Sequence, residues 1–107
     1  MRREWDLDEL IDAWTLLKPD LELIGNKYGA TRLGFAVILK FFQIEGRFPR
    51  HSGEIPPAAL DYVAGQMKVD PAEFAGYAFT GRTAEYHRAQ IRDRWASGRS
   101  AAVMRTS

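Results

Sequence analysis

The chain has 107 residues, most simply one domain, and its 46% hydrophobic residues are enough to build a single core. The net charge of +1 does not by itself indicate a polyanionic partner, and the absence of cysteine excludes disulfides, thiolate nucleophiles and cysteine-based zinc sites. No apolar run reaches the roughly 18 residues of a membrane span, and the start turns acidic too soon for a signal peptide. We therefore expect a cytoplasmic protein without a membrane partner.

The first 45 residues carry an acidic excess, with eight Asp or Glu against six Lys or Arg. Asp6 and Glu9 have the spacing of a capping box, so a helix is expected to begin there and to end after Lys18, before Pro19. Residues 20–24 could add a short helical turn. The first helix has an apolar stripe at helical spacing: Leu7, Leu10, Ile11, Trp14 and Leu17.

The segment 32–45 is apolar around most of its circumference and is predicted to be the central, buried helix. Thr31 is the expected N-cap and Gly46 the expected stop. A buried strand is the rival for its apolar run, but the length favours a helix. Lys27 and Arg32 flank its start and are either surface charges or weak contacts for a ligand.

The second part of the chain is basic, because residues 46–107 hold nine Lys or Arg and six Asp or Glu. The longest loop, 46–57, carries Arg47, Arg50 and His51, which are either solubilising or a second contact surface. Helices are predicted over 57–67 and over 70–77.

The most informative segment is 82–95, which reads as one amphipathic helix. Ala84, Ile91 and Trp95 can face a core, while Arg88 and Arg92 lie one turn apart on another face. Such a rod suits the phosphates and major groove of a nucleic-acid duplex. The alternative is a plain surface helix whose arginines pair with Glu85 and Asp93, and the pattern alone decides nothing between them.

The whole pattern predicts an all-α fold, a compact bundle of five or six short helices over 1–95 followed by a flexible tail over 96–107. The last three helices could form a helix-turn-helix, in which the final helix enters the groove. Arg82 and Thr83, the latter a candidate N-cap, could then hold a phosphate at the helix start. The reading or positioning residues would be Arg82, Thr83, Tyr86, Arg88 and Arg92.

Signals of enzymatic chemistry are absent from the sequence, which has no phosphate-binding loop, no nucleophile elbow and no zinc-protease motif. The two histidines, His51 and His87, lack ligand-like neighbours, so we predict no metal site and no cofactor. His87 is expected to donate a hydrogen bond at the edge of the core or to a phosphate.

Two motifs, together with the segments around them, resemble a known family. Arg32–Phe42 followed by Gly46–Pro49, and the pattern of Thr83, His87, Ile91 and Arg92, are similar to the N-terminal domain of the large replicative transposases of class II transposons, the Tn-three type. The resemblance covers about residues 1–92 and implies recognition of the terminal inverted repeats, with double-stranded DNA as the partner.

Carried over to this chain, the resemblance places DNA contacts on Arg82, Thr83, His87, Arg88 and Arg92, with Lys27, Arg32, Arg47 and Arg50 as weaker candidates. The family's catalytic, metal-binding domain has no counterpart here, so we expect no enzymatic activity. The departure from the family pattern after Arg92 suggests a truncated reading frame or an isolated domain. The alternative function is a regulatory remnant that docks to a full-length transposase through an apolar patch around Trp5, Phe48 or Trp95.

Overall fold

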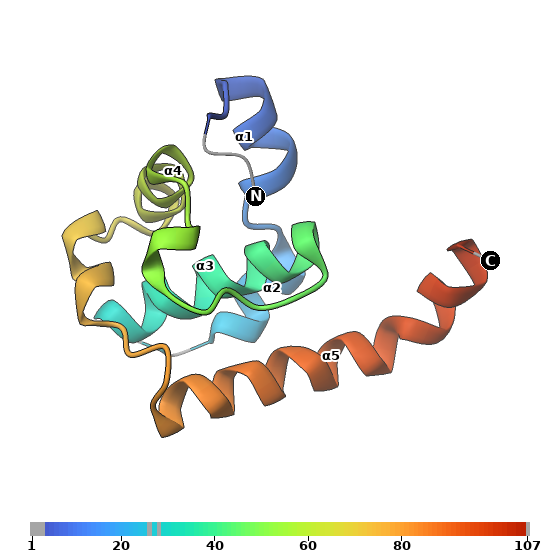
Figure 1. Ribbon diagram of the computed structural model, residues 1–107. Helices are drawn as coiled ribbons and strands as arrows, with labels where there is room; N and C mark the ends of the chain where they lie inside the picture. The colour runs from blue at the N-terminus through green and yellow to red at the C-terminus, as the bar shows by residue number, and fades with distance from the viewer. Residues whose placement is uncertain (1–3, 26, 28, 107) are drawn as a thin grey trace.

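The computed structural model describes residues 4–25, 27 and 29–106, with the backbone alone described from residue 95 onward. Helices account for all regular structure in these residues, which confirms the all-α prediction (Figure 1). They are α1 (Leu7–Trp14), α2 (Lys18–Ile24), α3 (Gly29–Glu45), α4 (Pro57–Met67) and α5 (Arg82–Thr106), together with two short 3-10 helices, η1 (Ser52–Glu54) and η2 (Pro71–Gly76).

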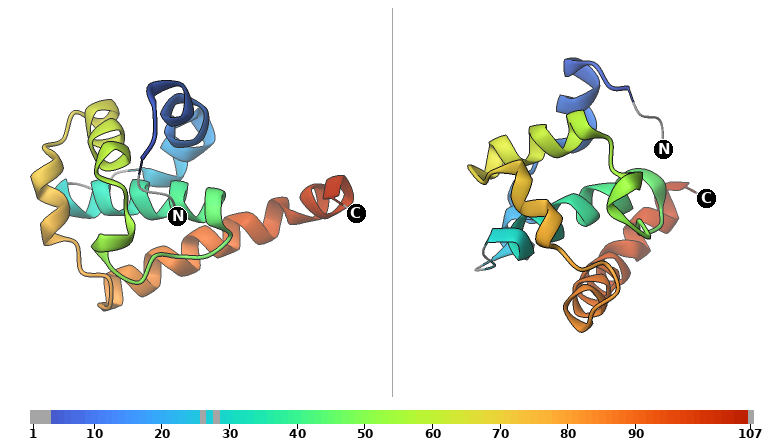
Figure 2. Two further views of the ribbon diagram at one scale, coloured as in Figure 1. Left: turned by 45° about the horizontal axis from the view of Figure 1, so that its top comes forward. Right: turned by 60° about the vertical axis from the view of Figure 1, so that its left-hand side comes forward.

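Helix α3 is the centre of the fold, as its apolar circumference predicts. Every residue from Leu33 to Phe41 is buried, and α1, α2, α4, η2 and α5 all pack against this helix. Helices α3 and α5 run side by side in the same direction, and the segment 46–56 returns along them from the end of α3 to the start of α4 (Figures 1 and 2). One hydrophobic core therefore connects Leu10 near the start of the chain with Ile91 near its end.

Several helix boundaries differ from the predictions. The capping box forms, with Asp6 accepting from the Glu9 amide at 2.9 Å and Glu9 accepting from the Asp6 amide at 3.0 Å, but α1 ends at Trp14. Pro19 lies in the first turn of α2, where its missing N–H costs nothing, so its assignment as a stop was wrong. Thr31 is likewise inside α3, which begins at Gly29, and is not the N-cap.

A buried ion pair ties α2 to α3. The Lys40 ammonium lies 3.0 Å from the Asp20 carboxylate, and both side chains are almost completely buried. Asp20 also accepts hydrogen bonds from the Leu17 amide and from the Gln43 side chain, each at 2.8 Å. A buried carboxylate with three donors is fully compensated, so the pair fixes the register of α2 on α3.

Tyr77 links the second half of the chain to α3 at Gly34. A β-carbon at Gly34 would fall within the Tyr77 ring, so only glycine lets this ring lie directly on the helix backbone. On its other side the Tyr77 hydroxyl is hydrogen-bonded to Nδ1 of His87 in α5 at 2.8 Å. A single aromatic side chain therefore sets the distance between α3 and α5.

The predicted helix-turn-helix does not form as a separate unit. Its middle element, expected as a helix over 70–77, is the 3-10 helix η2, started by Asp70 accepting from the Ala72 amide at 2.9 Å. Both η2 and α5 pack against α3. The aromatic residues Phe74 and Tyr77 are buried in that contact, and this burial outweighs the regular helix pattern of the segment.

Helix α5 was expected to end near Trp95, whereas its backbone stays helical to Thr106. The side chains from Trp95 onward lie outside the described residues. The placement of Trp95 in the core and the flexible tail over 96–107 therefore stay predictions.

The Gly34–Tyr77 contact gives a test of the packing. Replacing Gly34 by Ala should lower the free energy of unfolding by about 1–3 kcal/mol, because the new methyl group must displace the ring. Gly65→Ala is the matched control, since nothing lies within 4 Å of its missing β-carbon and it is exposed within α4. That change should raise stability by about 0.5–1 kcal/mol. Urea denaturation measures both, and equal effects would contradict the role of Gly34.

Candidate nucleic-acid interface

Helix α5 has a buried and an exposed side, as its sequence predicts. Ala84, His87 and Ile91 are buried, and the first two turns expose Arg82, Thr83 and Tyr86. The Tyr86 side chain is 65% exposed, the largest exposed fraction among the large hydrophobic residues described. Arg82 and Tyr86 are four residues apart and share one side of the helix, so both are accessible to a ligand from the same direction.

His87 is not available to a ligand, which corrects its prediction as a DNA contact. It is 2% exposed, lies edge-on to the Phe35 ring with centroids 4.9 Å apart, and is hydrogen-bonded to the Tyr77 hydroxyl. The alternative, a hydrogen bond at the edge of the core, is what the structure shows. Burial, with a smaller contribution from the nearby Lys27 charge, lowers the pKa of His87 to about 4, so the ring is neutral at pH 7.

Burial of His87 makes stability depend on pH. The pKa of His87 is about 4 in the folded chain and near its ordinary value of 6.5 in the unfolded chain, so only the unfolded chain binds a proton between these values. The free energy of unfolding should therefore fall by up to about 3 kcal/mol as the pH drops from 6.5 to 4. His87→Gln should remove this decrease above about pH 5.5, where few carboxylates titrate.

His51→Gln is the matched control, because His51 is exposed and this variant should keep the decrease. Chemical denaturation at stepped pH values measures the profiles. A wild-type profile that stays flat between pH 6.5 and 4.5 would contradict the burial of a neutral imidazole.

Arg88 belongs partly to the fold. Its Nη1 donates to the Phe79 carbonyl at 2.9 Å, and the side chain is half-buried. This bond satisfies a carbonyl in the segment that leads into α5. Arg88 therefore positions the start of the helix and presents only part of its guanidinium group to solvent.

The loop between α3 and α4 is held together by Glu54. Its Oε1 lies 2.7 Å from Nη2 of Arg47, and its Oε2 accepts from the Arg50 amide at 2.5 Å. The Arg47 guanidinium also donates to the Phe48 carbonyl at 3.2 Å and lies over the Phe41 ring. These hydrogen bonds to Arg47 and Arg50 lower the pKa of Glu54 to about 2, so the carboxylate stays charged.

Phe48 joins this loop to α5. Its ring stacks on Phe42 of α3 with centroids 4.6 Å apart, and the Arg92 guanidinium carbon lies 5.9 Å from the Phe48 ring centroid. The loop cations and the Arg88–Arg92 edge of α5 thus adjoin each other. We call this surface the basic seam, formed by Arg47, Arg50, His51, Arg88 and Arg92.

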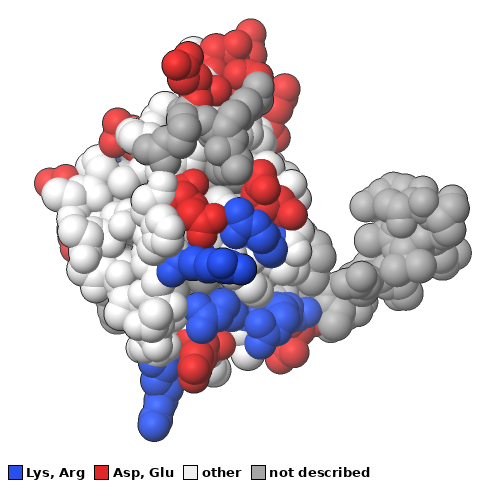
Figure 3. Space-filling model, viewed as in Figure 1, with Lys and Arg blue, Asp and Glu red and all other residues white. Residues whose placement is uncertain are grey.

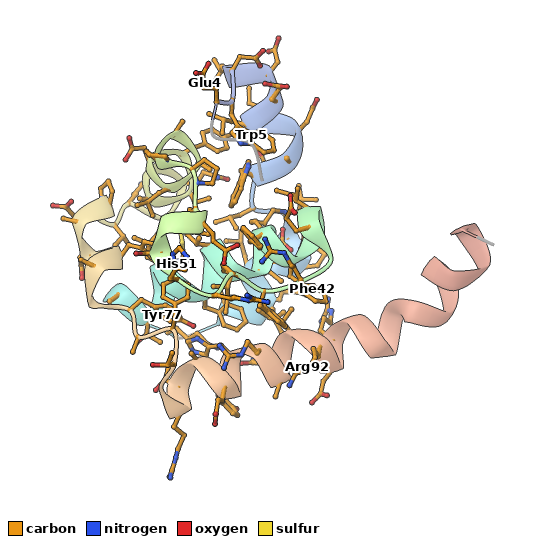
Figure 4. The ribbon with its side chains drawn as sticks, in the orientation of Figure 1. Glu4, Trp5, Phe42, His51, Tyr77 and Arg92 are labelled. Atoms are coloured by element: carbon orange, nitrogen blue, oxygen red, sulfur yellow. The ribbon has the colours of Figure 1, made fainter. Side chains whose placement is uncertain are left out.

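The basic seam collects positive charge on one side of the molecule. Figure 3 shows Lys and Arg gathered where the 46–56 segment meets α5, with Asp and Glu directly above and below them and a larger acidic group over α1. In Figure 4 His51 lies above α3 and Arg92 reaches up from α5. Within the described residues neither Glu85 nor Asp93 forms an ion pair with an arginine, and Arg50 and Arg92 have none either. The paired-surface alternative therefore does not describe this helix.

Lys27 and Arg32 lie outside this cluster of contacts. The Lys27 ammonium lies 4.3 Å from the centroid of the Phe35 ring and donates to the Ile24 carbonyl, and partial burial lowers its pKa. Arg32 is half-buried on α3. Lys27 is thus engaged in packing, and neither residue contributes a fully exposed charge.

Sequence reasoning missed two residues that organise the site. Glu54 stands in a loop without periodicity, so nothing in the sequence pairs it with Arg47 or Arg50. Tyr77 was expected only as a helix end. In the described residues no cluster of three His, Asp or Glu side chains could hold a metal ion, and none of the helices described is both long and apolar enough for a membrane span.

The fold and the basic seam together define a small helical domain with one cationic face. Comparison with known proteins places it in a family: residues 1–99 match the model of DUF4158, described as a domain of unknown function, and the chain belongs to that family. It is 35% identical over 86 residues to the transposase for transposon Tn501 of Pseudomonas aeruginosa, an alignment that covers 79% of this chain and 9% of that protein.

These matches confirm the resemblance to transposases of the Tn-three type. The chain spans about a tenth of the length of this curated relative. No solved structure matches it.

Proposed function

We propose that this domain binds double-stranded DNA at the ends of a transposon, recognising the terminal inverted repeats as part of a transposition system. The observation that carries the proposal is the basic seam, where Arg50 and Arg92 extend into solvent without an acidic partner among the described residues. Unpaired guanidinium groups on one face attract a phosphate backbone and release its counterions. The similarity to a transposase supports the ends of a transposon as the DNA that is bound.

In this proposal the two sides of α5 make different kinds of contact with DNA. The seam edge, with Arg92 beside the loop, holds phosphates and sets the position of the domain on the duplex. Arg82, Thr83 and Tyr86, exposed in the first two turns, are the residues offered to base edges or to the neighbouring backbone. His87 supports the helix from beneath, and we assign no catalytic step to this chain.

Binding to a duplex of the transposon end should weaken steeply with salt, with a slope of about −0.9 per neutralised phosphate in a plot of log K against log salt. Arg50→Ala and Arg92→Ala should each reduce the slope by about one and weaken binding roughly tenfold at 0.1 M salt. Fluorescence anisotropy against this duplex and a scrambled duplex measures affinity and specificity together.

Lys18→Ala is the matched control, because it removes one exposed positive charge from α2 and not from the seam. Its affinity should stay within about twofold of the wild type, as expected for a screened, distant charge. Equal losses for Lys18, Arg50 and Arg92 would show only nonspecific attraction. Equal affinity for the transposon-end duplex and the scrambled duplex would contradict specific recognition of transposon ends.

A second candidate function is docking to a full-length transposase, favoured by apolar side chains that the fold leaves exposed. Two of the predicted anchors are engaged in packing, since Trp5 packs edge-on to Trp14 and Phe48 stacks on Phe42, and the third, Trp95, has its side chain outside the described residues. Three of the five residues in the apolar stripe predicted for the first helix are instead exposed, together with one residue of α2: Leu7, Ile11, Leu17 and Leu21. These lie in pairs four residues apart, as two short apolar edges on α1 and α2.

The docking candidate is tested by exchanging Leu7 and Ile11 for Ser and measuring binding to a full-length transposase of this type by titration calorimetry. The double variant should lose at least tenfold in affinity if the α1 edge is buried on docking, because two aliphatic side chains then stay in water. Tyr86→Ser, at an equally exposed position on α5, should have little effect. Unchanged affinity of the double variant would leave DNA binding as the sole function proposed.

A further inference from the structure

The acidic residue inside the basic seam is engaged entirely by its own loop. Both carboxylate oxygens of Glu54 are occupied, Oε1 by the Arg47 guanidinium and Oε2 by the Arg50 amide. Its charge is balanced by Arg47, and its two bonds hold residues 47 and 50 at a fixed separation. The Glu54 carboxylate therefore lowers the positive charge of the loop but fixes its conformation.

The same loop fixes the orientation of His51. Its Nδ1 accepts from the Gly53 amide at 3.1 Å, so the neutral ring carries its proton on Nε2. A β-carbon at Gly53 would lie 2.9 Å from Nδ1, so a larger residue there would displace the His51 ring. With Nδ1 bonded inside the loop, the Nε2–H of this exposed side chain is the donor left for a ligand.

These residues surround a depression of about 400 Å³ lined by Arg47, Arg50, His51 and Glu54. Two groups supply further donors, the guanidinium of Arg50 and Nε2 of His51. Arg50 adds an unpaired charge, and its planar group can give two parallel hydrogen bonds to a tetrahedral oxyanion. An open, cationic depression with preset donors suits one phosphate group.

We propose that this depression seats a single phosphodiester of the bound DNA, contacted by Arg50 and His51, and that Glu54 is a positioning residue that holds the Arg50 backbone in place, while the Gly53 amide orients His51. The inference rests on the proposed function and adds to it a defined phosphate seat away from α5. Arg47 neutralises Glu54 and does not itself hold the phosphate. In this proposal one strand of the duplex crosses the 46–54 loop, and α5 contacts the DNA next to the bound phosphodiester.

The direction in which Glu54→Gln changes the affinity for DNA tests this inference. If Glu54 only repelled DNA, Glu54→Gln would strengthen binding, because the chain gains one positive charge. A positioning role predicts the opposite, a loss of about three- to tenfold as the seat loses its shape. Glu85→Gln on α5 is the matched control: it makes the same charge change at an exposed side chain without an ion pair among the described residues, and should leave binding unchanged or tighter.

A double-substitution cycle separates positioning from a general loss of structure. In the Arg50→Ala background the effect of Glu54→Gln should shrink to less than half of its size in the wild type, because the contact it supports is gone. Far-UV circular dichroism and the melting temperature check that each variant is folded. Full additivity of the two substitutions would overturn the positioning role.

The two histidines supply a direct readout of the seat. On titration with the transposon-end duplex, the imidazole NMR signals of exposed His51 should shift, while those of buried His87 stay in place. Inorganic phosphate at the same ionic strength should move the His51 signals far less, since a free ion lacks the rest of the duplex. An unmoved His51, or equal strengthening by Glu54→Gln and Glu85→Gln, overturns this inference alone. A wild-type chain that binds no duplex overturns the proposed function as well.

Discussion

The position of α5 depends on one aromatic contact. Tyr77 lies directly on the backbone of α3 because Gly34 has no side chain, and its hydroxyl then meets His87 on the buried side of α5. Burial raises the pKa of Tyr77 to about 12 and lowers that of His87, so both groups stay neutral and the bond between them persists across the physiological range. The contact between Tyr77 and His87 thus helps to fix the position of the α5 arginines relative to the 46–56 loop.

The basic seam is built from parts that are some 40 residues apart along the chain. The loop contributes Arg47, Arg50 and His51, held locally by Glu54, while α5 contributes Arg92 through its contact with Phe48. Local bonds thus set the shape of each half, and aromatic packing brings the halves together. Lys and Arg form a band at the seam, with Asp and Glu on either side of it and a larger acidic group over α1 (Figure 3), so the positive potential offered to a polyanion is confined to this band.

The domain aligns with only 9% of a much longer relative, and this affects the binding strength to be expected. A few guanidinium groups on a surface of this size give modest affinity on their own. When a domain is joined to further DNA-binding segments, its binding becomes intramolecular and gains from a high effective concentration. The exposed aliphatic edges on α1 and α2 would suit contacts with such neighbouring segments.

Local rules in the sequence determined the helical class, the buried centre and the basic bias of the second half. The length of its apolar run identified α3 and periodicity identified α5, and the capping box at Asp6 and the proline at position 57 identified two helix starts correctly. These signals operate within a few residues, where spacing alone decides which side chains share a face. The same reasoning failed at Pro19 and Thr31, where tertiary packing chose between helix starts and stops that local preferences leave almost equal in energy.

Only the tertiary structure decided which polar residues serve the core and which serve the surface. His87 shares its helical spacing with the core residues Ala84 and Ile91, and the Tyr77 and Phe35 rings enclose its polar side chain. Leu7 and Ile11 have the spacing of a core stripe, yet both are exposed in the described part of the chain. Glu54 became an organising residue because the loop folds back on Arg47 and Arg50. Burial and loop closure depend on residues distant in the chain, and a one-dimensional pattern carries no record of those distances.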